Sequence, residues 1–164
     1  MMSTDNNGSK DIPGTGTLYA QGHHEPSSDG WVDFELGPSG GEITLQVDSF
    51  NNVTLGYSQS GVSGYQSISF SIIFALGIPV GKPPIELVYP SPESDFQSLS
   101  TCRTDNFATR HFILESGKVF LSRPAEDNYT ATFEMTLVER NNVNVKMYIT
   151  NGRFDVTGFP VTSA

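Results

Sequence analysis

The sequence has little cysteine and little positive charge, and each shortage excludes a class of protein. Its 164 residues include one cysteine, Cys102, so an intramolecular disulfide cannot form. A zinc site of the usual four-ligand kind would need three partners other than that thiolate. The 9 basic residues stand against 18 acidic ones, which gives a formal net charge of −9. Because this charge repels phosphate backbones, we expect no nucleic-acid partner.

Long apolar runs are missing as well. The most apolar stretch, SISFSIIFALGIPVG at residues 67–81, is shorter than the roughly 20 residues that a membrane-spanning helix needs. Its first part has the two-residue period of a strand, with Phe70, Ile72 and Phe74 on one face. Because Ile73 makes the other face apolar too, the segment predicts a central strand that is covered on both sides.

The N-terminal residues lack the features of a secretory signal. Residues 1–16, MMSTDNNGSKDIPGTG, contain neither a basic start nor an apolar core. We therefore expect a cytoplasmic protein by default, and leave open a removed signal or another route of export. Residues 1–14 are expected to be a disordered tail, and residues 15–164 a single domain, since a chain of this length can bury one sizeable core.

What the sequence does have is alternation of apolar with polar or small residues. Alternating positions predict further strands at residues 32–36, 43–47, 53–57, 85–89, 112–114, 119–121, 131–137, 143–149 and 154–156. ESGK at 115–118 predicts a short hairpin, and TNGR at 150–153 a second one, because Asn-Gly supplies the positive φ angles of a two-residue turn. No helical period interrupts this pattern. We expect an all-β fold, an antiparallel β-sandwich or jelly roll of about ten short strands, with a closed barrel as the alternative.

Two polar stretches separate the predicted strands. Residues 56–67, GYSQSGVSGYQS, contain two tyrosines and are a hairpin tip, an adaptable binding loop or a mobile surface connection. Residues 90–110 form a longer irregular stretch, of a length that is uncommon in compact domains unless the loop is functional or disordered. If a loop carries the function, we expect it to be the longer one.

Metal-ligating residues gather in one short motif. HHEP at 23–26 and the nearby aspartate bring together four candidate ligands, His23, His24, Glu25 and Asp29. Neighbouring residues of an extended chain point to opposite faces, so only one of the two histidines would reach a given ion. A solvated segment is the simpler interpretation, and we expect no metal and no cofactor.

Catalytic groups are equally sparse. Cys102 and His111 would make a nucleophile and base if the loop between them closed, although a buried cysteine near an unrelated histidine is the simpler interpretation. Asp33 and Glu35 would suit a glycosidase only beside a cleft, and their spacing puts both on the polar face of a strand.

Residues 129–156, YTATFEMTLVERNNVNVKMYITNGRFDV, resemble the closing strands of small bacterial β-sandwich proteins, many of them uncharacterised. In those proteins a GTFEFT-like strand leads to an ITNGxFDV-like hairpin. TATFEMT lacks the glycine with which that strand usually starts. The resemblance implies a β-sandwich fold and no particular activity, because no functional residue belongs to the motif.

We therefore expect a non-catalytic binding or interaction domain whose partner is a protein or a glycan. Aromatic rings stack on sugars and anchor protein interfaces, and the candidate ligand contacts are Trp31, Tyr57, Tyr65 and Phe107. Two alternatives stay open. One is a membrane-active or pore-forming bacterial β protein, such as a toxin subunit, in which YQSISFSIIFALG at residues 65–77 would join a barrel. The other is an enzyme that uses His111 and residues 90–110. The number of subunits also stays open.

Overall fold

The computed structural model describes residues 15–26, 31–37, 41–47, 52–62, 64–75, 79–91, 96–104 and 109–157. Within these segments the protein forms ten strands and no helix: β1 (Thr15–Glu25), β2 (Phe34–Leu36), β3 (Glu42–Val47), β4 (Asn52–Ser60), β5 (Tyr65–Ala75), β6 (Ile85–Tyr89), β7 (Phe96–Thr104), β8 (Thr109–Ala125), β9 (Asn128–Glu139) and β10 (Asn142–Thr157). The predicted all-β fold is confirmed. The predicted tail, residues 1–14, lies outside the described residues.

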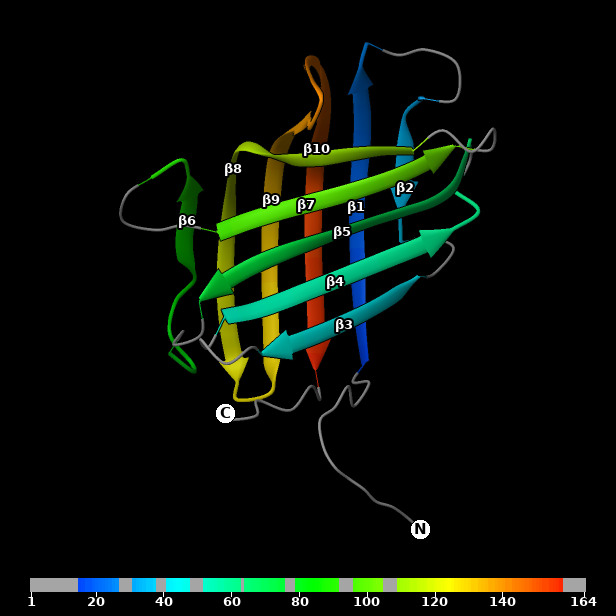
Figure 1. Cartoon of the computed structure of the whole chain (residues 1–164). Helices are drawn as coiled ribbons and strands as arrows, with labels where there is room; N and C mark the ends of the chain where they lie inside the picture. The colour runs from blue at the N-terminus through cyan, green and yellow to red at the C-terminus, as the bar shows by residue number, and fades with distance from the viewer. Residues whose placement is uncertain are drawn as a thin grey trace.

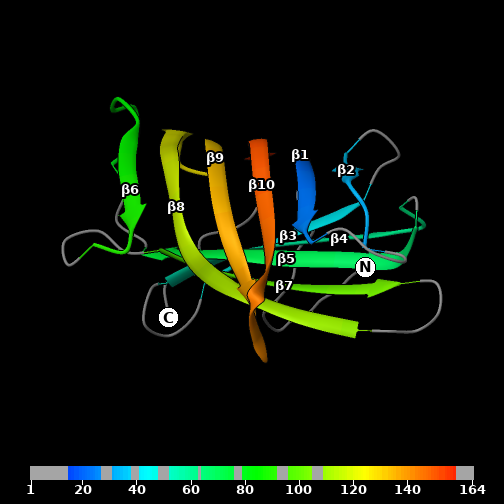
Figure 2. The ribbon, with the colours of Figure 1, turned by 90° about the horizontal axis from the view of Figure 1, so that it is seen from above.

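All the strands belong to one antiparallel sheet that curls into a half-barrel. Its order is β2-β1-β10-β9-β8-β7-β5-β4-β3, and β6 pairs with β8. Strands β3, β4, β5 and β7 run across β1, β9 and β10, and seen from above the two sets lie one over the other (Figures 1 and 2). Strand β8 belongs to both sets. It pairs with β7 near Ile113, and near Leu121 it pairs with β9 on one side and β6 on the other.

The core lies between the two sets of strands. β5 pairs with β4 on one side and with β7 on the other, and the side chains of Phe70, Ile72 and Phe74 are 6%, 0% and 2% exposed. The prediction of a central strand with Phe70, Ile72 and Phe74 in the core is therefore confirmed. The predicted cover of its other face is wrong, because Ser69, Ser71 and Ile73 on that face are only half-buried. Rings from the two sets meet across the core, with centroids 6.1 Å apart for Phe70 and Phe133 and 5.9 Å apart for Phe74 and Tyr129.

The predicted ESGK hairpin is wrong. β8 runs through these residues as one strand of 17 residues. Its pairing with β9 shifts between Leu114 and Ser116, which leaves Glu115 as the extra residue of a β-bulge. A bulge bends a strand without ending it, and here it lies where β8 passes from the neighbourhood of β7 to that of β6.

The predicted TNGR hairpin is also wrong, although its backbone conformation was anticipated correctly. Asn151 has a φ of 53°, the positive value that Asn-Gly favours. β1 and β9 nevertheless pair with β10 both before and after this point, so the chain cannot turn back. The pairing with β9 passes from Ile149 to Gly152 while β9 advances by one residue fewer, so Asn151 forms a β-bulge.

The predicted loop at residues 90–110 is wrong as well, because β7 occupies its middle. The buried side of β7 consists mainly of small polar residues, so its sequence does not alternate between apolar and polar residues as a half-buried strand usually does. Ser98 Oγ donates a hydrogen bond to Ser71 O at 2.7 Å, and Ser100 Oγ donates one to Ser69 O at 2.9 Å. These bonds to the β5 backbone satisfy the hydroxyls, which allows serine to replace apolar residues here.

Candidate functional site

Three of the four aromatic residues predicted to contact a ligand are buried. Trp31, Tyr57 and Tyr65 are 5%, 5% and 1% exposed, and Phe107 lies outside the described residues. The stretch predicted as a loop at 56–67 is mostly the ends of β4 and β5 with a short hairpin between them. The three buried rings pack in the core, so a ligand role for them stays a prediction that requires the fold to open.

Trp31 and Tyr65 belong to a buried cluster around His24. Tyr65 Oη donates to Val32 O at 2.6 Å and lies 2.9 Å from His24 Nδ1, so the histidine donates to the hydroxyl oxygen. Burial lowers the pKa of His24 to about 4 and raises the pKa of Tyr65. His24 is therefore a neutral core residue that ties β1 to β5. The guanidinium carbon of Arg110 lies 4.1 Å from the Trp31 ring centroid at the margin of this cluster.

Cys102 and His111 do not form a nucleophile and base, and the simpler interpretation, a buried cysteine near an unrelated histidine, is confirmed. Cys102 lies opposite Arg110 in the ladder of β7 and β8, and it points into the core, where burial raises its thiol pKa to about 12. His111 lies on the outer face, and its Nδ1 is 3.2 Å from Thr101 Oγ1. The two side chains point to opposite sides of the sheet and cannot exchange a proton.

The prediction of a solvated segment at HHEP is wrong, because His23, His24 and Glu25 belong to β1 and His24 is buried. His23 forms a cluster of ion pairs there. His23 Nδ1 lies 2.7 Å from Asp33 Oδ1, and His23 Nε2 lies 2.6 Å from Glu25 Oε2. These bonds, Glu25 first and then Asp33, raise the pKa of His23. As alternation predicts, His24 points the other way. In the segments that the structure covers, no three His, Cys, Asp or Glu side chains are placed to hold a metal ion, and Asp29 lies outside them.

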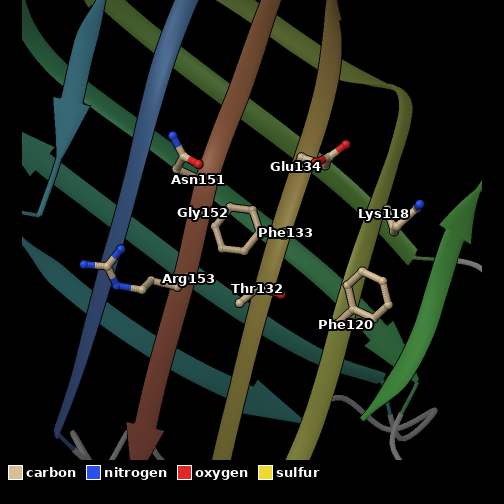
Figure 3. Close-up of a pocket in the computed structure, with 8 residues that line it drawn as sticks. All are labelled: Lys118, Phe120, Thr132, Phe133, Glu134, Asn151, Gly152 and Arg153. Atoms are coloured by element: carbon tan, nitrogen blue, oxygen red, sulfur yellow. The ribbon is translucent and has the colours of Figure 1, made fainter.

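A different surface gathers aromatic and charged groups: the outer face of β8, β9, β10 and β1. One row of side chains crosses all four strands. Phe120 lies opposite Thr132, Thr132 opposite Arg153, and Arg153 opposite Tyr19. We call these four residues the cross-strand row. Figure 3 shows its first three members on neighbouring strands, and Phe120 is 42% exposed.

Two hollows adjoin the cross-strand row. The first, of about 340 Å³, is lined by Phe120, Thr132 and Arg153 of the row and by Lys118, Glu134 and Asn151 (Figure 3). The second, of about 550 Å³, is lined by Arg153 and Tyr19 of the row together with Thr17, Thr130 and Asp155. Arg153 lines both hollows, so the two adjoin at this side chain. These volumes fall in the range of small-molecule sites.

The side chains of this face hold one another in place. The Arg153 guanidinium carbon lies 4.4 Å from the centroid of the Tyr19 ring. Tyr19 Oη donates to Glu35, and this bond raises the pKa of the tyrosine. Asn151 Nδ2 donates to Gln21 Oε1 at 2.6 Å. Ordered side chains lose less entropy when a ligand binds, so this face is suited to recognition.

Sequence reasoning missed this face because it looked for ligand contacts in loops. The alternation of inward and outward residues along β8 nevertheless indicates this face. Val119 and Leu121 point inward, which places Phe120 outward between them. A large aromatic residue out of phase with the core is the feature that marks the face.

The pore-forming hypothesis rests on the β5 segment, which is paired on both edges and buried on its inner side. Among the described residues, no helix is long and apolar enough to cross a membrane. Neither observation tests that hypothesis. No protein-family model, no curated protein and no solved structure matches this chain, and the resemblance of residues 129–156 to bacterial β-sandwich proteins stays a prediction.

Proposed function

We propose that the protein is a non-catalytic binding domain that recognises a glycan or a protein through the outer face of β8, β9, β10 and β1. The observation that carries this proposal is the cross-strand row, which has an aromatic ring at each end and polar groups between them. Aromatic rings give contact area, while hydroxyl, amide and charged groups fix the orientation of a ligand.

The placement of the reactive groups favours binding over catalysis. Cys102 is buried with a raised pKa, and His111 lies on the other outer face, beside Thr101. The ionisable groups near the cross-strand row are engaged locally, since Lys118 Nζ lies 3.6 Å from Glu86 and Arg153 covers the Tyr19 ring. Charged groups held in this way are suited to forming hydrogen bonds with a polar ligand.

We also propose that the fold is the β-sandwich predicted from the sequence. This proposal is supported by the two sets of strands, which cross over one shared core (Figure 2). Sandwiches whose sheets cross steeply have corners at which one strand bends from one sheet into the other. The bulge of β8 at Glu115 supplies such a corner.

A glycan array and a pull-down with the parent protein and two variants test the proposed function. Phe120→Ala removes the exposed ring of the cross-strand row, and Leu99→Ala removes an apolar side chain of similar exposure, 49%, from the other outer face. We expect Phe120→Ala to lose the captured glycan or protein and Leu99→Ala to keep it. A parent protein that is blank in both assays, or two variants that bind equally well, would contradict the proposal.

A further inference from the structure

We infer that the ligand is a neutral, linear oligosaccharide that lies across the strands, along the cross-strand row of Phe120, Thr132, Arg153 and Tyr19. This inference rests on the proposed binding function and specifies its ligand. Three features of the face support it: the length of the row, the placement of its aromatic rings, and the balance of its charges.

The first feature is length. The row crosses four neighbouring strands, β8, β9, β10 and β1, by direct pairing. Neighbouring strands lie about 4.8 Å apart, so the two ends of the row are separated by about 14 Å. The two hollows adjoin at Arg153, and the inferred ligand would lie over this side chain. One sugar ring fills part of this length, whereas a short chain of sugars fills all of it.

The second feature is the position of the rings. Phe120 is exposed at one end and lines only the first hollow. Tyr19 lies at the other end, and the Arg153 guanidinium covers its ring there. The apolar C–H face of a sugar packs on an aromatic ring or on the plane of a guanidinium group. The arrangement therefore offers one stacking position in each hollow, which we call the Phe120 subsite and the Tyr19 subsite.

The third feature is charge. The hollows are lined by the basic Lys118 and Arg153 and by the acidic Glu134 and Asp155. Two further carboxylates lie beside them, because Glu86 pairs with Lys118 and Glu35 accepts a hydrogen bond from Tyr19. The face therefore carries both hydrogen-bond donors and acceptors, and a sugar hydroxyl is both a donor and an acceptor. The net charge of −9 for the whole chain repels a polyanionic glycan. Neutral sugars match this face better than charged ones.

Isothermal titration calorimetry with sugars of increasing length tests the inference. The probes are glucose and the maltose and cellobiose series up to six units, with oligogalacturonates as the anionic arm. We expect at least one neutral series to bind, with affinity rising at least tenfold from the single sugar to the tetrasaccharide and then levelling off once the row is filled. The anionic series should bind at least tenfold more weakly than the neutral series.

Three variants locate the ligand. Phe120→Ala and Tyr19→Ala each remove one stacking position, so each should lower tetrasaccharide affinity at least tenfold and reduce the gain with length. Leu99→Ala, on the other outer face, should leave both affinity and length dependence unchanged. Thermal melts of all three variants establish that each is folded at the temperature of the titration.

The outcomes separate the inference from the proposed function. Binding of a single sugar as tight as that of the tetrasaccharide, or preference for the anionic series, overturns the inference and leaves glycan binding by this face intact. Capture of a protein that depends on Phe120, with no sugar bound, also overturns the inference while the proposed function stands. Binding of neither a sugar nor a protein overturns both.

Discussion

The two outer faces of the half-barrel differ although their inner faces line the same core. The outer face of β8, β9, β10 and β1 carries the cross-strand row and four charged groups. The outer face of β3, β4, β5 and β7 holds a hollow of about 360 Å³ whose lining includes Glu42, Leu99 and the hydroxyl groups of Thr44, Ser58, Ser69, Ser71 and Thr101. Both faces lie on the same core, and we take the contrast between them as support for the proposal that the charged and aromatic face binds the ligand.

The largest expected effect on stability comes from the core that the two sets of strands share. Phe74→Ala in β5 and Phe133→Ala in β9 each truncate a buried ring, 2% and 4% exposed. Each should lower the free energy of unfolding by about 3–5 kcal/mol, because a buried phenylalanine leaves a cavity when truncated. Urea denaturation of both variants beside the parent measures this. An unchanged midpoint for either variant would place that ring at the surface.

Acid should lower the stability of the fold through His24, which links β1 to β5. Its folded pKa of about 4 lies below the ordinary value of 6.5, so the unfolded chain takes up a proton first as the pH falls. Stability is unaffected above pH 6.5, and we expect a loss of up to about 3 kcal/mol between pH 6.5 and 4. The raised pKa of exposed His23 acts with the opposite sign, because its stabilisation is present at low pH and is lost as the pH rises, but solvent screens it.

Denaturation of the parent and of His24→Gln at several pH values isolates this contribution. The variant lacks the titrating group, so the difference in stability between the two proteins should shrink as the pH falls from 7 to 5. Carboxylates that titrate in both proteins cancel in this difference. A difference that stays constant over that range would show that His24 is protonated in the folded state or is not buried.

The two halves should respond differently to an added methyl group. A Cβ at Gly152, in the bulge of β10, would overlap the ring of Phe133, so Gly152→Ala should cost about 1–3 kcal/mol through overpacking. A Cβ at Gly56, in β4, would meet only Thr44 Oγ1, at 2.8 Å, and that hydroxyl can rotate away. We expect Gly56→Ala to change stability by less than about 0.5 kcal/mol. Thermal melts of the two variants compare them, and equal effects would mean that the bulge is not packed as described.

The sequence predicts most of the strands and their inner faces, because alternation is a local property, but it misses β1 and β7. Whether Asn151 makes a turn or a bulge is not local, since it depends on β1 and β9 continuing along both sides of β10. The strand at β7 escapes detection because its buried serines bond to the β5 backbone, a partner about 30 residues away. The candidate site was missed for a simpler reason: the outward position of Phe120 follows from the same alternation, but aromatic residues were sought in loops.

The smallest expected effect on stability separates recognition from packing. Phe120 and Leu99 are 42% and 49% exposed, on opposite outer faces, and substitutions at such positions usually change the free energy of unfolding by less than about 0.5 kcal/mol. Phe120→Ala and Leu99→Ala should therefore melt within error of the parent, while only Phe120→Ala loses ligand. If Phe120→Ala instead cost several kcal/mol, the ring would be a packing residue, and any loss of binding would follow from unfolding. Equal stability with unequal binding assigns the aromatic face, and not the hydroxyl face, to recognition.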